Sequence, residues 1–305
     1  MKNTHIEHPE DCVLSGDLSV LDWFTADNST ISTKIDGSPA IVWGTNPATG
    51  NFFVGTKSVF NKKLIKINES HDDIDRNHSG KVATILHKCF VYLPRIDGIF
   101  QGDFIGFGGD NVYQPNTIAY VFDEIVQEQI IITPHTYYEA DDDLRNAVVK
   151  PYNFDNWMDK GTTDCKFFVE WVDLKERKDL TDRCNFARQI ATICVYPESN
   201  RQIARIKKQL NRCFKEKVHL DDLTLEAIAF DNDCDVNLLR LWKLVHSIKM
   251  DLFDYIIDLD INNTECYIHG EQVWHEGYVM YNEFGTYKLI DRLVFSSANF
   301  NTVRT

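Results

Sequence analysis

The feature that most constrains the fold is a change of hydrophobic period partway along the chain. Up to about residue 175, apolar residues fall in short runs rich in Val, Ile, Phe and Tyr, separated by Gly, Pro, Asn and Asp. That pattern is typical of β-strands. The runs lie at 40–43, 52–56, 98–107, 118–126, 129–133 and 166–172. Between Gly80 and Pro94 the spacing is helical instead, which predicts one helix among the strands.

From about residue 182 to 260 the helical period takes over. One apolar stripe consists of Ile203, Ile206, Leu210 and Phe214, and a second, more fully buried helix is predicted from Leu238 to Ile256. Strand-like runs return between 266 and 295. We therefore predict an α+β fold with a mixed or antiparallel sheet. Its expected parts are a core at 1–178, an all-helical insertion at 179–261 and closing strands at 262–305 that return to the core.

Composition narrows the class of protein. No run approaches the roughly 20 apolar residues of a membrane span, and the first residues lack the apolar stretch of a signal peptide, so a cytoplasmic protein without membrane contact is expected. Eight cysteines are scattered without a CxxC pair. This favours reduced thiols over a zinc knuckle or a disulfide framework.

The charge is unevenly distributed. The net charge is −14, yet residues 200–217 hold seven Lys or Arg against one Glu. A helix of that length would extend about 27 Å. Two interpretations stay open for this basic segment, a solvated helix face or a docking face for nucleic acid.

A lysine at a tight turn is the first candidate for chemistry. Residues 32–40 read STKIDGSPA, so Lys34 is followed at once by turn-forming residues and then by a strand. An amine that a tight turn holds in place is suited to act as a nucleophile. Because a lysine pKa of about 10.4 keeps the amine protonated near neutral pH, other cations or a metal would have to converge on it. A simple surface hairpin explains the four letters KIDG equally well.

Lys34-Ile-Asp36-Gly37 resembles the Lys-x-Asp-Gly nucleophile motif of the covalent nucleotidyltransferase superfamily, which contains ATP-dependent RNA and DNA ligases and mRNA capping enzymes. The following Ser38 resembles the RNA-ligase branch, and the Asp-Gly-Ser-Pro-Ala form is most similar to phage-encoded members. Further segments resemble the later motifs in the family's order: Gly55-Thr-Lys57-Ser58, Gln101-Gly-Asp103-Phe-Ile-Gly106, Tyr120-Val-Phe122-Asp123, Glu276-Gly277-Tyr-Val-Met and Tyr287-Lys288-Leu-Ile-Asp-Arg292.

The resemblance implies a nucleotidyltransferase core of the ATP-grasp-like ligase type and a three-step reaction. Lys34 would attack the α-phosphate of ATP, the AMP would pass to a 5′-phosphate end, and a 3′-hydroxyl would displace it. Glu276 and Lys288 would assist catalysis, with Glu276 beside Mg²⁺ or Mn²⁺. The resemblance assigns nucleotide binding to Asp36, Gly37, Lys57, Asp103, Phe122, Lys288 and Arg292. Among these, Phe122 would stack on adenine and Asp103 would bind the ribose.

Some residues depart from the family pattern. Ser32 and Thr33 replace the usual acid before the nucleophile, and Asp103 is one methylene shorter than the usual Glu. The final motif normally holds two lysines two residues apart, but Ile290 occupies the second place. Arg292 is expected to supply the missing charge, since alternate residues of a strand share one face.

Too few residues follow Lys288 for the OB-fold domain of DNA ligases and capping enzymes, so no C-terminal OB-fold is expected. The helical insertion would then bind the nucleic acid. The residues predicted for this role are Arg201, Arg205, Lys208, Arg212 and Lys215.

The hypothesis favoured by the sequence is that the protein is an RNA-ligase-like repair enzyme. It would work in the host cytoplasm if it is a viral protein. Three alternatives remain: a DNA-ligase-like enzyme without an OB-fold, an adenylyltransferase that modifies a protein or small molecule, and a non-catalytic relic that binds nucleotide or nucleic acid. RNA is favoured over DNA as partner. The sequence leaves open whether nicks or single strands are sealed, and the oligomeric state.

Overall fold

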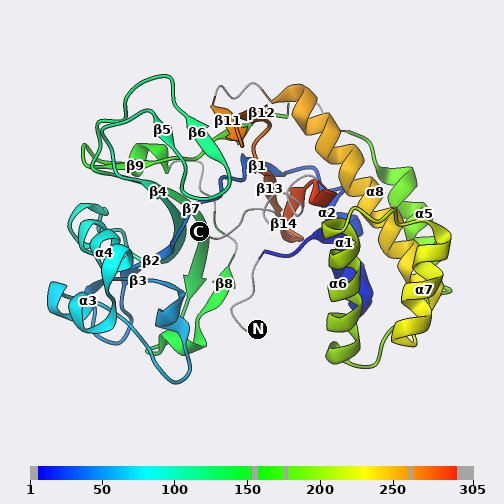
Figure 1. The fold of residues 1–305 in the computed structure, drawn as a ribbon. Coiled ribbons are helices and arrows are strands. Elements are labelled where there is room, and N and C mark those ends of the chain that lie inside the picture. Colours follow the sequence, from blue (N-terminus) through cyan, green and yellow to red (C-terminus); the bar gives the residue numbers. More distant parts are fainter. Residues whose placement is uncertain (1–5, 151, 153–156, 175–177, 261–263, 294–305) are drawn as a thin grey trace. The chain divides into compact units, whose positions relative to one another are not determined.

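The computed structural model describes residues 6–150, 152, 157–174, 178–260 and 264–293 (Figure 1). These residues form two compact units, each assembled from separate stretches of chain. The first unit contains residues 35–170 and 264–275, and the second contains 6–34, 171–260 and 276–293. The chain thus passes from one unit to the other directly after Lys34 and again directly before Glu276.

The first unit is built on two sheets. In one, β3 (Phe52–Gly55), β2 (Ala40–Thr45), β4 (Ile99–Gly106), β7 (Ile130–Glu139) and β8 (Val148–Lys150) are antiparallel neighbours in that order, and β9 (Cys165–Phe167) pairs with β7 in parallel. The other has the order β12 (Glu271–Val273), β11 (Glu265–Ile268), β6 (Ala119–Val121) and β5 (Val112–Tyr113). The helices are α3 (His71–Asn77) and α4 (Gly80–Tyr92), with 3-10 turns at η2 (Lys57–Phe60), η3 (Leu144–Asn146) and η4 (Met158–Lys160).

Aromatic side chains fill much of the first unit's interior. Trp43 of β2 and Phe167 of β9 stack with ring centroids 6.1 Å apart, and Trp157 packs edge-on against Phe100 at 4.8 Å. Large rings bury more apolar area than other side chains. They therefore stabilise β2, β4 and β9 in the arrangement that carries several motif residues.

The second unit combines one sheet with most of the helices. The sheet order is β10 (Trp171–Val172), β1 (Thr30–Thr33), β13 (Gly277–Asn282) and β14 (Gly285–Ile290), antiparallel throughout. The helices are α1 (Pro9–Cys12), α2 (Ser19–Trp23), α5 (Thr181–Ala191), α6 (Asn200–Lys215), α7 (Asp222–Asn232) and α8 (Val236–Leu259), with the 3-10 turn η1 (Val13–Ser15).

Helix α8 organises the second unit's core. It contacts α5, α7, α1 and β14, and Leu241, Val245 and Ile256 on its buried side belong to one apolar cluster that also includes Ile31 of β1 and Leu289 of β14. The helices α5 to α8 occupy the region in which helices were predicted. They share their core with β1, β13 and β14 instead of forming a separate body.

The run at 166–172 shows where a sequence pattern merges two elements. Its apolar residues predict one strand, but β9 belongs to the first unit's sheet and β10 to the second unit's sheet. The fold is α+β with mainly antiparallel sheets. Within the described residues, no helix has both the length and the apolar character that a membrane crossing requires.

Candidate functional site

Three residues from the predicted motifs meet in the second unit. Lys34 follows β1 and Glu276 precedes β13, and the pairing of Thr33 with Tyr278 brings these strand ends together. The backbone N–H of Lys34 donates to the carbonyl of Gly277 at 2.7 Å. The ammonium of Lys34 forms an ion pair with the carboxylate of Glu276. Their side chains keep 22% and 12% of their surface exposed, so the pair remains open to a ligand.

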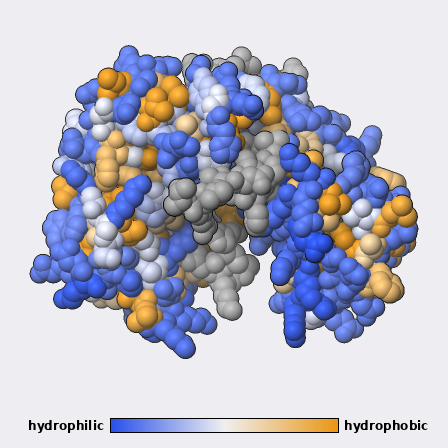
Figure 2. Space-filling model, in the orientation of Figure 1, coloured by the Kyte–Doolittle hydropathy of each residue, from blue (hydrophilic) through white to orange (hydrophobic). Residues whose placement is uncertain are grey.

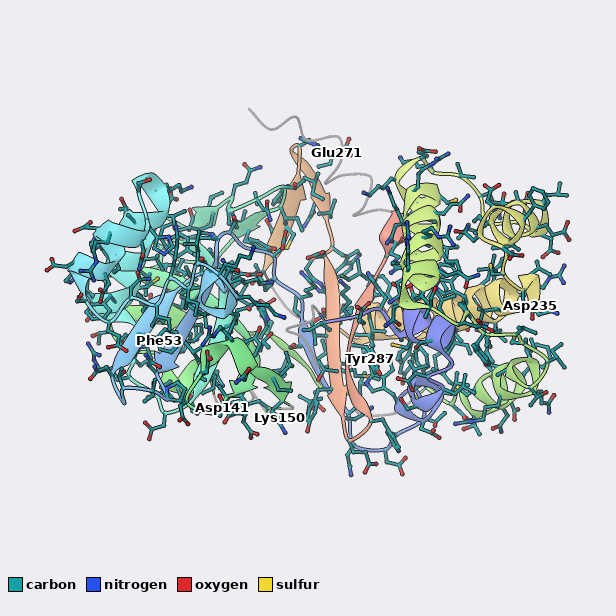
Figure 3. The ribbon with its side chains drawn as sticks, turned by 90° about the horizontal axis from the view of Figure 1, so that it is seen from below. Phe53, Asp141, Lys150, Asp235, Glu271 and Tyr287 are labelled. Carbon is teal, nitrogen blue, oxygen red and sulfur yellow. The ribbon has the colours of Figure 1, made fainter. Side chains whose placement is uncertain are left out.

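Lys288 completes this group, which we name the lysine cluster (Lys34, Glu276 and Lys288). It lies on β14, marked by Tyr287 in Figure 3, and pairs with Val279 of β13. Burial lowers the pKa of Lys288, and the positive charges of Lys34 and Arg292 act in the same direction. The cluster therefore brings two lysines to the carboxylate of Glu276, and the carboxylate of Glu7 also acts on Lys288.

A steric constraint explains why the Glu-Gly motif has a glycine. Gly277 has a φ of +145°, and a Cβ on it would lie 2.2 Å from the carbonyl oxygen of Leu289. L-residues rarely adopt that backbone conformation and no Cβ fits at that distance. Glycine is therefore required where β13 begins, next to Glu276.

The Asp-Gly turn lies in the first unit, against β4. The N–H of Asp36 donates to the hydroxyl of Tyr120 at 2.7 Å, and its carboxylate accepts from the amide of Asn116 at 2.6 Å. A Cβ on Gly37 would lie 2.6 Å from the carbonyl oxygen of Phe104 and 3.0 Å from Cβ of Asp103. This close approach sets the turn directly beside Asp103.

Lys57 and Asp103 also lie near one another in the first unit. Burial lowers the pKa of Lys57, whereas the carboxylate of Asp103 opposes that change. Nε2 of His135 on β7 is 3.6 Å from an oxygen of Asp103. The two predicted nucleotide ligands thus share one neighbourhood with the Asp36 turn, and His135 adds a titratable group that the sequence did not indicate.

Phe122 lines a cavity of about 650 Å³ in the first unit. Its ring packs edge-on against Phe168 at 4.8 Å, and the ammonium of Lys166 lies 5.9 Å from its centroid. The other lining residues include the acids Asp123, Glu124 and Glu128. Three carboxylates repel phosphate groups, so the cavity suits an uncharged ring better than a triphosphate.

Arg292 has a different role from the one expected. β14 ends at Ile290, so strand alternation does not extend to Arg292. Its side chain is 3% exposed and binds Asp11 at 2.6 Å and Glu10 at 3.3 Å. The expectation that Arg292 replaces the missing lysine on phosphate is therefore corrected, because its charge is already neutralised inside the protein.

Arg292 belongs to a group that we name the buried cluster (Glu10, Asp11, Lys249 and Arg292). Nζ of Lys249 on α8 donates to Glu10 at 2.8 Å and to the carbonyl of Ile290 at 3.0 Å. Burial raises the pKa of Glu10, but the adjacent Lys249 and Arg292 cations outweigh it and hold the pKa well below its ordinary value. The buried cluster thereby fastens the end of β14, two residues beyond Lys288.

The predicted nucleic-acid ligands lie on α6. All five (Arg201, Arg205, Lys208, Arg212 and Lys215) are exposed. The structure places them in the second unit, as it does the lysine cluster.

No pattern in the sequence indicated several of the contacts in these sites, even where the residue belonged to a predicted motif, as Tyr120 does. Tyr120 and Asn116 reach Asp36 across 84 and 80 residues, and Asp11 reaches Arg292 across 281. Glu7, whose carbonyl accepts from the N–H of Lys288 at 3.1 Å, sits in an irregular N-terminal stretch. Only the turn-forming character of residues 36–39 indicated that the chain before β2 is held in place.

Glu276 is the residue of the lysine cluster that could bind a divalent metal. Among the described residues, no group of three or more His, Cys, Asp or Glu is placed to hold a metal ion. Mg²⁺ usually keeps several waters and binds one or two carboxylates together with substrate phosphates. Two lysines close to Glu276 repel a free metal ion, so a metal would fit here only together with the phosphates of a bound nucleotide.

Comparison with known proteins gives a family but no activity. No curated protein and no solved structure matches the chain. Residues 3–218 and 173–304 match the model of a family of unknown function, DUF6267. The matched segments span nearly the whole sequence, and the chain belongs to this family.

Proposed function

We propose that the protein is an ATP-dependent nucleotidyltransferase of the RNA-ligase type, in which Lys34 carries AMP and passes it to a 5′-phosphate end. The observation that carries the proposal is the lysine cluster. Lys34 and Glu276 are 242 residues apart in the sequence, yet they form an ion pair, with Lys288 close enough for the Lys34 charge to lower its pKa. Three residues selected by motif resemblance thus lie close together, which supports the proposal.

The cluster supplies what an amine nucleophile requires. Glu276 orients the Lys34 side chain and accepts its proton, and the nearby positive charge of Lys288 favours the neutral amine. The Lys34 nitrogen then forms a bond to the α-phosphorus, the bond from that phosphorus to the bridging oxygen breaks, and pyrophosphate leaves with the electron pair. Mg²⁺ or Mn²⁺ bound with the phosphates beside Glu276 would supply neutralisation of the charge on the leaving group.

Other residues assigned to the nucleotide lie in the first unit. Lys57 is placed by the start of η2, and Asp103 by its position in β4 between Ala40 of β2 and Thr133 of β7. We propose that these two bind ATP phosphate and ribose, and that Phe122 stacks on the adenine. The mixed charge of this group suits a ligand with both hydroxyl and phosphate groups.

The test is formation of a covalent adduct. Incubation with ATP labelled at the α-phosphate and Mg²⁺ or Mn²⁺ should add one AMP per chain, seen by denaturing electrophoresis and intact mass, through an acid-labile, hydroxylamine-sensitive bond. Lys34→Ala should abolish the adduct with the fold intact, and Lys62→Ala, an exposed lysine of the first unit, should leave it unchanged. An unmodified mass with every nucleotide and metal tried would sink the proposal.

A second candidate function is binding of nucleotide or nucleic acid without catalysis. Ile290 stands where the family has a second lysine, and the buried Arg292 does not supply that charge. A cluster with one cation fewer stabilises the leaving pyrophosphate less. ATP that binds reversibly, with no covalent adduct, would select this function.

A further inference from the structure

Helix α6 presents its positive charge as one continuous stripe. Arg201, Arg205, Lys208, Arg212 and Lys215 follow one another at spacings of four and three residues, which places them on one helix face. All are exposed, whereas Ile206, Leu210 and Phe214 are buried in the unit's core. At about 1.5 Å per residue the stripe is about 21 Å long. Figure 2 shows a strongly hydrophilic column over this helix.

Most of this charge is uncompensated. Arg212 pairs with Glu216 at 3.2 Å, whereas Arg201, Arg205 and Lys208 form no ion pair with any residue that the structure describes. Like charges four residues apart destabilise a helix, and a cation in the first turn opposes the helix dipole. The first turn of α6 holds no acid. A protein of net charge −14 thus retains an unfavourable cluster of cations, as expected where the cations bind an anionic partner.

The composition of the face argues against a protein partner. Exposed residues between the cations include Ala204 but no large apolar or aromatic side chain. Protein interfaces depend on such side chains as buried anchors. A phosphate backbone needs none, because its binding is largely electrostatic.

A direct chain of contacts joins α6 to the lysine cluster within the second unit. Lys207, on the flank of the stripe, forms an ion pair with Glu7 at 3.3 Å. The carbonyl of Glu7 accepts from the N–H of Lys288, and Glu7 also forms a bridge to Tyr287. One residue therefore touches both the basic helix and the strand that carries Lys288.

We infer that the exposed face of α6 binds the phosphate backbone of nucleic acid, with Arg201, Arg205 and Lys208 as its main contacts. The nucleic-acid strand runs toward Lys288 past Glu7 and presents its 5′-phosphate to the lysine cluster. The direction of the strand rests on the proposed function. The binding face does not.

The experiment compares two variants with the same loss of charge. One carries Arg201→Gln, Arg205→Gln and Lys208→Gln, and the control carries Lys62→Gln, Lys63→Gln and Lys81→Gln, exposed lysines of the first unit. Affinity for 5′-phosphorylated single-stranded RNA, and for DNA of the same sequence, is measured by fluorescence anisotropy over a salt series. Circular dichroism checks that each variant is folded.

The α6 variant should bind at least about tenfold more weakly near 0.1 M salt, and its plot of log affinity against log salt should be less steep by about 2, since each single-strand contact adds about 0.7 to the slope. The control should match the wild type. Equal slopes for wild type and α6 variant, or an equal reduction in both variants, would overturn the inference. The RNA and DNA arms show which sugar the strand carries.

Intact mass after incubation with ATP separates this inference from the proposed function. The α6 variant should still take up AMP, because its substitutions leave the lysine cluster unchanged. If no protein takes up AMP while the salt slopes differ as expected, the proposed function fails and the binding face stands. If AMP is taken up while the slopes are equal, the reverse holds.

Discussion

Two groups of charged residues lie along β14 in the second unit, and they differ in exposure. In the lysine cluster, Lys34 and Glu276 keep 22% and 12% of their side-chain surface exposed, and two lysines lie around the carboxylate of Glu276. In the buried cluster, no side chain exceeds 6% exposure, and two carboxylates balance two cations. The groups are two residues apart on the chain, at Lys288 and Ile290.

The difference shows which arrangement of charge can take part in chemistry. A partly exposed group that holds two lysines can bind an anion and exchange a proton with its ligand. A sealed and balanced group can do neither, because removing one partner leaves a charge uncompensated in the interior. The buried cluster therefore holds β14, and the lysine cluster uses the position that β14 provides.

The largest expected effect tests the buried cluster. Lys249→Ala removes the ammonium that contacts Glu10 and the Ile290 carbonyl, so it should lower the free energy of unfolding by about 3–5 kcal/mol. Lys34→Ala should lower it by less than about 1 kcal/mol, since a partly exposed ion pair contributes little. Urea unfolding followed by circular dichroism measures both. Equal losses would mean that the two groups do not differ as described.

The second test uses pH. Burial, with Lys249 acting in the same direction, lowers the pKa of His246 from 6.5 to about 4. As pH falls from 6.5 to about 4 the unfolded chain gains a proton that the folded chain does not, so stability decreases by up to about 3 kcal/mol. His246 stacks on Trp242 with ring centroids 5.6 Å apart. His246→Phe keeps an aromatic ring there and should remove this part of the pH dependence.

Urea unfolding of wild type and His246→Phe at several pH values gives the difference directly, since Glu10, Asp11, Arg292 and Lys249 face His246 in both proteins. The gap between the two stability curves should shift in favour of His246→Phe below pH 6.5. A constant gap would show that the surroundings of the buried cluster do not exclude a proton from His246.

The smallest expected effects distinguish the roles of Lys288 and Arg292, the two cations near the end of β14. Lys288→Gln should slow adenylate formation tenfold or more, which corresponds to about 1.4 kcal/mol. It should not lower stability, because burial already disfavours the charged form of Lys288. Arg292→Gln should do the reverse, with lower stability and a nearly unchanged rate per folded molecule. Single-turnover labelling and urea unfolding of both variants decide it, and slow labelling by a stable Arg292→Gln protein would return Arg292 to the site.

Local patterns predicted the local elements. The apolar runs at 40–43 and 52–56 correspond to β2 and β3, and the helical spacing from 203 to 214 corresponds to α6, because strand and helix periods depend on neighbours in the sequence. The requirement for glycine at 37 and 277 fits the turns that the motifs indicated.

Contacts between distant residues could not be predicted in this way. Lys249 lies in an apolar helical pattern that gives no sign of its partner Glu10, 239 residues away. The prediction that Arg292 binds phosphate assumed that strand alternation continues past Ile290, but β14 ends at that residue. The run at 166–172 looked continuous because period and composition do not change where the chain moves from one sheet to another.

The interleaving of the two units has a consequence for synthesis on the ribosome. β1 is made early, but its partner β13 is translated only after the whole helical region, and β14 comes later still. Until then one edge of β1 lacks its partner strand, and an unpaired strand edge is prone to wrong pairing. The ion pair between Lys34 and Glu276 likewise cannot form until Glu276 has been translated. A nascent or prematurely terminated chain that ends before Glu276 would therefore lack the reactive arrangement.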